Sequence, residues 1–168
     1  MKRGKSKAGS TGILPVHTRR RLPHWEIGGS TYFITFGTRE AELSAGARDI
    51  VLDACRHFDG IRYQLWAATI MPDHVHLLLT PMQKSHNEWF SLSSILHSIK
   101  SFTAKEINRR LNRRGPLWME ESFDRIIRGE QEFIENWQYI RNNPVKRGLC
   151  LTPEEWPWLY ESSSRDFI

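Results

Sequence analysis

Cysteine is scarce in this chain, and long apolar runs do not occur. The 168 residues include only two cysteines, Cys55 and Cys150, which excludes a disulfide framework and favours a reducing compartment. No stretch approaches the ~18 consecutive apolar residues of a membrane-spanning helix, and the apolar run at residues 13–16 is too short for a secretory signal. We therefore predict a soluble, cytoplasmic protein that does not enter a membrane.

Glycine and proline are also few, at 11 and 8 residues. With 39% hydrophobic and 26% charged residues, this composition excludes collagen-like and wholly disordered chains. The length suits one domain. We predict a flexible basic arm over residues 1–18, which lack periodicity, one folded domain over residues 19–160 and a short tail over residues 161–168.

Positive charge exceeds negative charge and is unevenly distributed, with a formal net charge of +5. Residues 1–21 contain seven Lys or Arg and no acid, and residues 100–114 contain six against one Glu. Clustered cations gain affinity for polyanions by displacing counterions from phosphates, which favours a nucleic-acid partner. A solubilising tail and a solvated helix face would produce the same pattern, so charge alone leaves both interpretations open.

Strand-like sequence occurs in three places. Residues 31–38 are β-branched and aromatic, follow a Gly-Gly turn signal and predict a strand. Two apolar runs, 63–71 and 74–80, are separated by Pro72-Asp73 and predict an antiparallel hairpin. Residues 117–128 form an irregular or strand-like passage.

Helical spacing of apolar residues occurs in three other segments. It predicts helices over residues 44–58, from Asn87 or Ser91 to about residue 112, and over residues 130–142. We expect the third helix to end before Pro144, because the residue before a proline avoids the helical region. The order of these elements predicts an α+β sandwich with helices on one face of an antiparallel sheet.

The segment MPDHVHLLL, residues 71–79, carries two histidines on a predicted strand. Successive side chains of a strand alternate faces, so His74 and His76 point the same way, with Cα atoms roughly 6.6 Å apart. Two such imidazoles can hold one metal ion while the apolar residues between and after them face the core. The pair alone does not separate a metal site from two histidines that a sheet surface merely tolerates.

Tyr139 and Asn143 are four residues apart and share one face of the third predicted helix. Tyrosine is a usable nucleophile toward phosphodiesters, because the covalent intermediate conserves the bond energy for religation. The ordinary alternatives are a core aromatic residue and a helix C-terminal residue before Pro144. Two imidazoles and one amide oxygen would leave positions open on a metal for phosphate, which favours Mg²⁺ or Mn²⁺, although Zn²⁺ or Ni²⁺ would bind the imidazoles tightly in vitro.

Taken in order, these blocks resemble a known family. MPDHVHLLL, followed roughly sixty residues later by YIRNNPVKRGL, is similar to the REP-associated tyrosine transposases, a branch of the IS200/IS605-like Y1 transposases of the HUH nuclease superfamily. The resemblance extends to RRLPHW and GGSTYFITF before the histidines, and to SLSSILHSIKSFTAKEIN, LWMEESFDRIIR and EEWPW after them. It covers about residues 19–160.

The resemblance implies a ferredoxin-like α+β domain with the histidines on a central strand. It makes His74, His76 and Asn143 the metal ligands and Tyr139 the nucleophile. The implied reaction is cleavage of single-stranded DNA, in which the tyrosine forms a 5′-phosphotyrosine and releases a 3′-OH, and reversal with another 3′-OH rejoins strands. The implied partner is single-stranded or hairpin DNA with palindromic repeats, in the cytoplasm of a bacterium, at its nucleoid.

Cationic residues between positions 19 and 147 are the candidate DNA contacts, although each could equally be a solvated surface charge. They are Arg19, Arg20, Arg21, Lys100, Lys105, Arg109, Arg110, Arg113, Arg114, Arg125, Arg128, Lys146 and Arg147. Trp25, Trp89 and Trp118 are candidates for stacking on unpaired bases. The basic arm lies outside the matched blocks.

Two other interpretations stay open. A domesticated, non-catalytic protein would bind repeat DNA only, and the presence of every motif residue argues against it. An HUH replication initiator or relaxase-like nickase would differ in substrate, and the absence of a helicase domain argues against it. The resemblance also leaves open whether the protein is a monomer or a homodimer that places the tyrosine on its partner's metal site.

Overall fold

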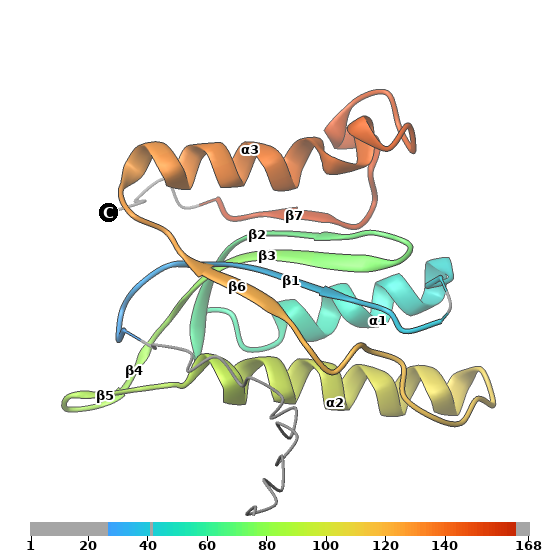
Figure 1. Cartoon of the computed structure of the whole chain (residues 1–168), viewed down its shortest axis with the longest axis horizontal. Helices are drawn as coiled ribbons and strands as arrows, with labels where there is room; N and C mark the ends of the chain where they lie inside the picture. The colour runs from blue at the N-terminus through green and yellow to red at the C-terminus, as the bar shows by residue number, and fades with distance from the viewer. Residues whose placement is uncertain (1–26, 41, 164–168) are drawn as a thin grey trace, which may run out of the picture.

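The computed structural model describes residues 27–40 and 42–163, which form a β-sheet with helices packed on it (Figure 1). The predicted strands and helices are present, and three short strands, at residues 83–85, 88–89 and 159–161, were not predicted from the sequence. The second helix begins after Ser91, so its alternative start at Asn87 is wrong. None of the described helices has the length and apolar character needed to cross a membrane. The elements are β1 (Tyr32–Gly37), α1 (Ala45–Arg56), β2 (Tyr63–Ile70), β3 (His74–Pro81), β4 (Gln83–Ser85), β5 (Glu88–Trp89), α2 (Leu92–Arg110), β6 (Phe123–Ile126), α3 (Glu130–Lys146), the 3₁₀ helix η1 (Pro153–Glu155) and β7 (Leu159–Glu161).

Five strands form one antiparallel sheet in the order β6-β1-β3-β2-β7. The first four of these strands, together with α1 and α2, follow the βαββαβ order of a ferredoxin-like domain, as the family resemblance implies. β2 and β3 form the predicted hairpin, in which Ile70 pairs with Val75 and Tyr63 with Pro81. β3 therefore lies in the middle of the sheet, with β1 on one side and β2 on the other.

Helices α1 and α2 cover one face of the sheet. Each begins at a serine whose Oγ accepts a backbone hydrogen bond, Ser44 from the Ala47 amide at 3.3 Å and Ser91 from the Ser94 amide at 3.2 Å. The apolar face of each helix packs against alternate residues of β3, which are Val75, Leu77 and Leu79. This layer holds the larger core.

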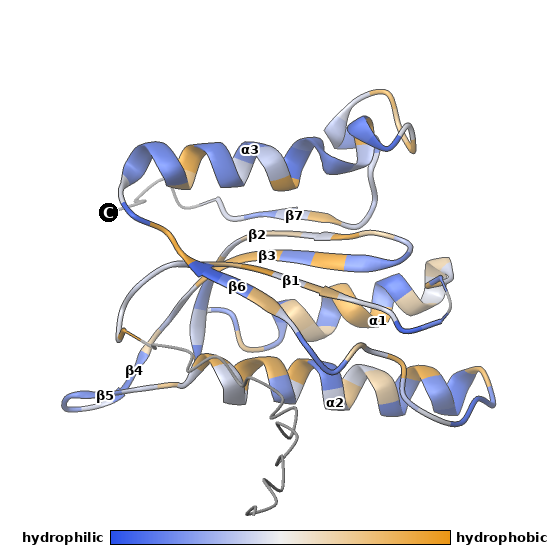
Figure 2. Ribbon diagram, viewed as in Figure 1, coloured by the Kyte–Doolittle hydropathy of each residue, from blue (hydrophilic) through white to orange (hydrophobic). Residues whose placement is uncertain are grey.

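Helix α3 covers the opposite face, so the prediction that all helices lie on one face is wrong (Figure 1). A second, smaller core lies there and joins Phe133 and Ile140 of α3 to Phe33, Ala67 and Leu78 of the sheet. Because β3 is buried on both sides, its apolar residues serve both layers, and the middle strands are largely hydrophobic in Figure 2. Periodicity identifies the apolar stripe of a helix but not the sheet face that this stripe covers.

Helix α3 passes through Pro144 and ends at Lys146, so the prediction that it ends before the proline is also wrong. Pro144 lacks the N–H that would bond to the carbonyl of the preceding turn. The last turn still closes, because the Arg147 amide donates to the Asn143 carbonyl at 3.1 Å and Gly148, at φ 67°, terminates the helix. Asn143 and Pro144 are both buried, so the turn that contains the proline belongs to the packed interior.

The second core should hold α3 in place. We expect Ile140→Ala, which truncates a fully buried side chain, to lower the free energy of unfolding by about 2–5 kcal/mol. Gln138→Ala on the exposed side of the same helix should change it by less than about 0.5 kcal/mol. Urea unfolding of both variants measures the difference, and equal effects would contradict this account of α3 packing.

Candidate functional site

His74 and His76 lie at the start of β3, on the sheet face that α3 covers. Their ring centres are 4.6 Å apart. Val75, between them, is fully buried in the opposite layer with α1 and α2. The strand therefore presents both imidazoles to one side, as its alternation predicts.

His76 is buried, with 4% of its surface exposed, and both ring nitrogens have partners. Nδ1 is 2.7 Å from Oγ1 of Thr35, and Nε2 is 3.3 Å from Nδ2 of Asn143. Because the Asn143 amide group donates to Nε2, the ring proton lies on Nδ1 and is donated to Thr35. Burial lowers the pKa of His76 to about 3, and the charge of His74 acts in the same direction, so the ring is neutral near neutral pH.

His74 is held by a carboxylate. Its Nδ1 is 2.7 Å from Oδ1 of Asp73, and Nη2 of Arg147 is 3.3 Å from the other carboxylate oxygen. Burial opposes ionisation of Asp73, but the hydrogen bond and charge of His74, with Arg147, lower its pKa overall. A carboxylate behind Nδ1 orients an imidazole so that Nε2 is the free acceptor, which is the arrangement of metal-ligating histidines.

Tyr139 lies beside the histidines, on α3. Its ring centre is 5.2 Å from that of His76 and 5.8 Å from that of Phe33, with edge-on geometry to both. The side chain is 41% exposed, which leaves it accessible to a large substrate. Nζ of Lys146 lies 5.4 Å from the centre of the tyrosine ring.

Asn143, one helical turn beyond Tyr139, completes the cluster. It is 6% exposed, and its Oδ1 is buried without a hydrogen bond from any described residue. A buried carbonyl oxygen without a donor is costly unless something else satisfies it. The sequence-predicted set of His74, His76, Tyr139 and Asn143 is thus brought together within one chain.

Two contributors were missed by sequence reasoning. Thr35 pairs in register with His76 and supplies its hydrogen-bond partner, while Phe33 stacks on the His76 ring at 5.5 Å. Alternation along residues 31–38 places Phe33 and Thr35 on one face, but only the register of β1 on β3 shows that this face carries the histidines. Asp73 was visible in the sequence as the neighbour of His74.

Four predicted DNA contacts lie on β6, in the loop after it, or at the end of α3. Lys146 and Arg147 occupy the last turn of α3 and its C-cap, next to Tyr139 and Asp73. Arg125 of β6 donates to Oδ1 of Asn136 at 3.0 Å and pairs with Glu132 of α3. Arg128 is exposed just before α3.

The remaining predicted DNA contacts are not brought to the site. Those on and after α2 belong to the layer on the other side of the sheet, and Arg109 and Arg110 both pair with Glu106. Lys100 points inward, because its Nζ donates to the carbonyls of Met119 and Glu120. The residues concerned are Lys100, Lys105, Arg109, Arg110, Arg113 and Arg114, while Arg19, Arg20 and Arg21 lie outside the described residues.

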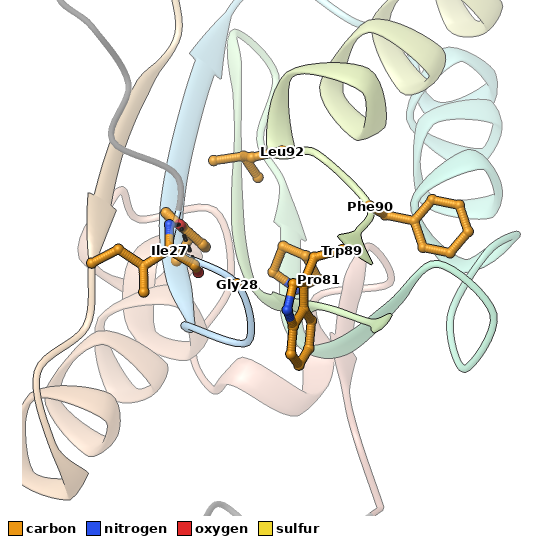
Figure 3. Close-up of a pocket in the computed structure, with 7 residues that line it drawn as sticks. Ile27, Gly28, Pro81, Trp89, Phe90 and Leu92 are labelled. Carbon is orange, nitrogen blue, oxygen red and sulfur yellow. Dashed lines mark hydrogen bonds between the residues drawn. The ribbon is translucent and has the colours of Figure 1, made fainter. Parts of the chain in front are cut away.

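The two described tryptophans proposed for base stacking lie away from the histidines, Trp118 in the core and Trp89, which is 39% exposed, near the other end of β3. Trp118 is buried and its Nε1 donates to Thr103 at 2.9 Å. Trp89 covers Gly28, where an added Cβ would lie 2.2 Å from the indole ring. It also lines an apolar cavity of about 190 Å³ with Ile27 and Pro81, at the far end of β3 from the histidines (Figure 3). That volume is below the ~300 Å³ lower limit of typical ligand pockets. Trp25 lies outside the described residues.

Known proteins are similar to this chain in sequence and in fold. The profile of the family described as "Transposase IS200 like" matches residues 39–143, which include both histidines, Tyr139 and Asn143. A protein named as a REP-associated tyrosine transposase, from Haemophilus influenzae, is 27% identical over 124 residues, which cover 71% of this chain and 68% of that protein. The solved structure of a REP-associated tyrosine transposase bound to a REP hairpin superposes with a TM-score of 0.65 at 21% identity, and covers 87% of this chain and 82% of that one.

The buried His76 ring should stay neutral in mild acid. Its pKa in the folded state, about 3, lies below the ordinary value of about 6.5, so the unfolded chain binds the additional proton. This contribution to stability is full above about pH 6.5 and is lost as the pH falls toward 3. We expect NMR signals of the His76 ring to stay constant between about pH 8 and pH 5. A titration midpoint near 6.5 would contradict the burial of this ring.

Proposed function

This chain belongs to the IS200-like transposase family, and on that basis we propose that it is a metal-dependent DNA strand transferase. It would cleave and rejoin single-stranded DNA at palindromic, REP-like hairpins through a 5′-phosphotyrosine intermediate. The observation that carries the proposal is the contact of Tyr139 with His76, at 5.2 Å between ring centres, within one chain. A half-exposed phenol beside two oriented imidazoles supplies a nucleophile next to a site suited to a phosphate-binding cation.

Tyr139 acts as the nucleophile in this proposal. Its oxygen bonds to the scissile phosphorus as the bond from phosphorus to the 3′ oxygen breaks. The phenol proton is lost, the leaving 3′ oxygen gains a proton to become a hydroxyl, and the 5′ phosphate stays on the tyrosine. One phosphodiester replaces another, so a different 3′-OH can reverse the reaction and rejoin strands without an energy-rich cofactor.

The residues around His76 fit a divalent cation. His74 and His76 each have Nδ1 engaged, by Asp73 and Thr35, which leaves Nε2 as the acceptor on each ring. On His76 a bound cation would replace the amide group of Asn143, which donates to Nε2. Rotation of that amide group by a half-turn would bring Oδ1 of Asn143, which has no hydrogen-bond donor among the described residues, to the same cation as a hard oxygen ligand. These three side chains would hold Mg²⁺ or Mn²⁺, or Zn²⁺ or Ni²⁺ in vitro, and the bound ion would polarise the scissile phosphate.

A hairpin substrate is proposed from similarity. The REP-associated transposase that shares this fold was solved with a REP hairpin. On this chain, Lys146 and Arg147 border the nucleophile and are exposed enough to contact phosphates. These cations support binding of the strand that passes Tyr139, and the convergence of all four family residues favours catalysis over repeat binding alone.

Removal of the phenol oxygen should abolish covalent chemistry. The substrate is a hairpin oligonucleotide whose sequence is taken from palindromic repeats in the DNA that flanks the gene, and the reaction contains Mg²⁺. We expect the wild type to form a protein–DNA adduct, detected by denaturing gel and mass spectrometry. Neither Tyr139→Phe nor His74→Ala should form it. Tyr160→Phe is the matched control and should still form the adduct, because Tyr160 bonds to Asp59 rather than to the site. An adduct in Tyr139→Phe would remove the assignment, and binding without cleavage in the wild type would favour the domesticated protein.

The active site should be complete within one chain. Tyr139, Asn143 and His76 are already in contact in a single copy, so we expect mixtures of Tyr139→Phe with His74→Ala to stay inactive. The assay is the same adduct formation after the two variants are mixed at equal concentration. Recovery of activity would instead indicate a dimer that exchanges the tyrosine between subunits.

A further inference from the structure

An exposed phenylalanine shares the sheet face of the candidate active site. Phe123, the first residue of β6, is 59% exposed, whereas the other aromatic residue on this face beside the histidines, Phe33, is buried. We propose that Phe123 is a platform on which one unpaired base of the substrate strand stacks, next to the scissile phosphate. This proposal rests on the proposed function, because it adds a base-binding residue to the same single-stranded DNA site.

The strand register places Phe123 in line with the site. Phe123 pairs with Thr35 of β1, and Thr35 pairs with His76 of β3. Directly paired residues of a sheet point to the same face, and Thr35 faces His76 because the two are hydrogen bonded. Two strand spacings separate Phe123 from His76, roughly 10 Å between Cα atoms, which is within reach of the base of a nucleotide whose phosphate lies at the histidines.

The contacts of Arg125 confirm this orientation. Arg125 is two residues further along β6, so its side chain points to the same face as that of Phe123. It donates to Asn136 of α3, which fixes this face as the one that α3 covers. The packing of α3 falls mainly on β2 and β3, while Phe123 and Arg125 of the outer strand β6 are exposed.

Lys100 holds the segment that leads to the platform. Its Nζ donates to the Met119 carbonyl at 2.8 Å, the Glu120 carbonyl at 3.3 Å and Oγ of Ser122 at 3.2 Å. The Met119 amide is further bonded to the Gly37 carbonyl at 2.9 Å. A platform fixed before the DNA arrives avoids the entropy cost of ordering a loop on binding.

The charges around Phe123 favour a base over a phosphate. Glu120 and Glu121 come directly before Ser122 and Phe123, and carboxylates repel the DNA backbone. Arg125, on the same face of β6, is paired with Glu132 and Asn136 of α3. Two further cations, Lys146 and Arg147, lie beyond the histidines, next to Tyr139 and Asp73. The backbone would therefore follow α3, with a base turned toward the aromatic ring, as in single-strand binding sites that combine a cationic track with stacking.

The test measures binding separately from cleavage. In a Tyr139→Phe background, fluorescence anisotropy gives the affinity for a hairpin oligonucleotide of the flanking palindromes that carries an unpaired flank. We expect Phe123→Ala to weaken binding by about 5- to 150-fold, which corresponds to one stacked base. Phe123→Trp should retain affinity and Phe123→Leu should lose most of it, because stacking needs a π-face. Phe102→Ala, an equally exposed phenylalanine at 57% on α2, is the matched control and should bind as the parent does.

Abasic substitutions identify the base. A single abasic nucleotide, moved along the unpaired flank, should weaken binding to the parent at one position, and Phe123→Ala should lose that sensitivity. Unchanged affinity in Phe123→Ala, full affinity in Phe123→Leu or an identical abasic profile in both proteins would overturn the platform. Stacking at Phe123 without an adduct at Tyr139 would leave the platform standing and remove the strand transferase, so the two proposals fail separately.

Discussion

The double-sided burial of β3 is the constraint on which the site depends. One set of alternate residues, Val75, Leu77 and Leu79, fills the core under α1 and α2, so the other set must face the opposite layer. That other set begins with His74 and His76 and continues with Leu78, which packs under α3. A shift of this strand by one residue would bury the imidazoles among aliphatic side chains and move three core residues out. The core thereby fixes the position of the histidines without using them.

The burial of β3 on both faces also sets the position of helix α3. Ile140 and Phe133 pack on Leu78 and its neighbours, and this contact sets which face of the helix meets the sheet. Tyr139 and Asn143 flank Ile140 along the helix, so they reach the histidines at the edge of that contact. The two residues therefore differ in exposure: Asn143 is buried against His76, while Tyr139 is partly accessible to solvent. The same turn includes Pro144, whose burial lets the helix continue to Lys146.

Local patterns in the sequence predicted the features of the fold that depend on residues close together in the chain. The hairpin, the helices and the shared face of His74 and His76 follow from alternation and periodicity, and the implied ferredoxin-like order agrees with the sheet. Contacts between distant segments were not predictable in this way. The positions of Phe33, Thr35 and Phe123 depend on the register of β1 with its two neighbours, and the face covered by α3 depends on which strand is central. The prediction that α3 ends before Pro144 was wrong, because it used only the local backbone preference of the residue before a proline and not the burial of that turn.

The fate of the basic residues shows why composition is a weak guide to an interface. In the sequence, the cations of residues 100–114 form one cluster. In the structure, Lys100 is hydrogen bonded to the loop before Phe123, and two arginines of the cluster, Arg109 and Arg110, pair with Glu106. Exposed ion pairs of this kind contribute little to stability, so Arg109 and Arg110 stay available to other anions, but on the side of the sheet away from Tyr139. Lys146 and Arg147 are fewer in number, yet they lie next to Tyr139 and Asp73, and Arg125 is on the sheet face that carries the exposed ring of Phe123. Proximity to the reacting groups, which the sheet determines, therefore outweighs the count of charges in deciding where a strand of DNA can pass.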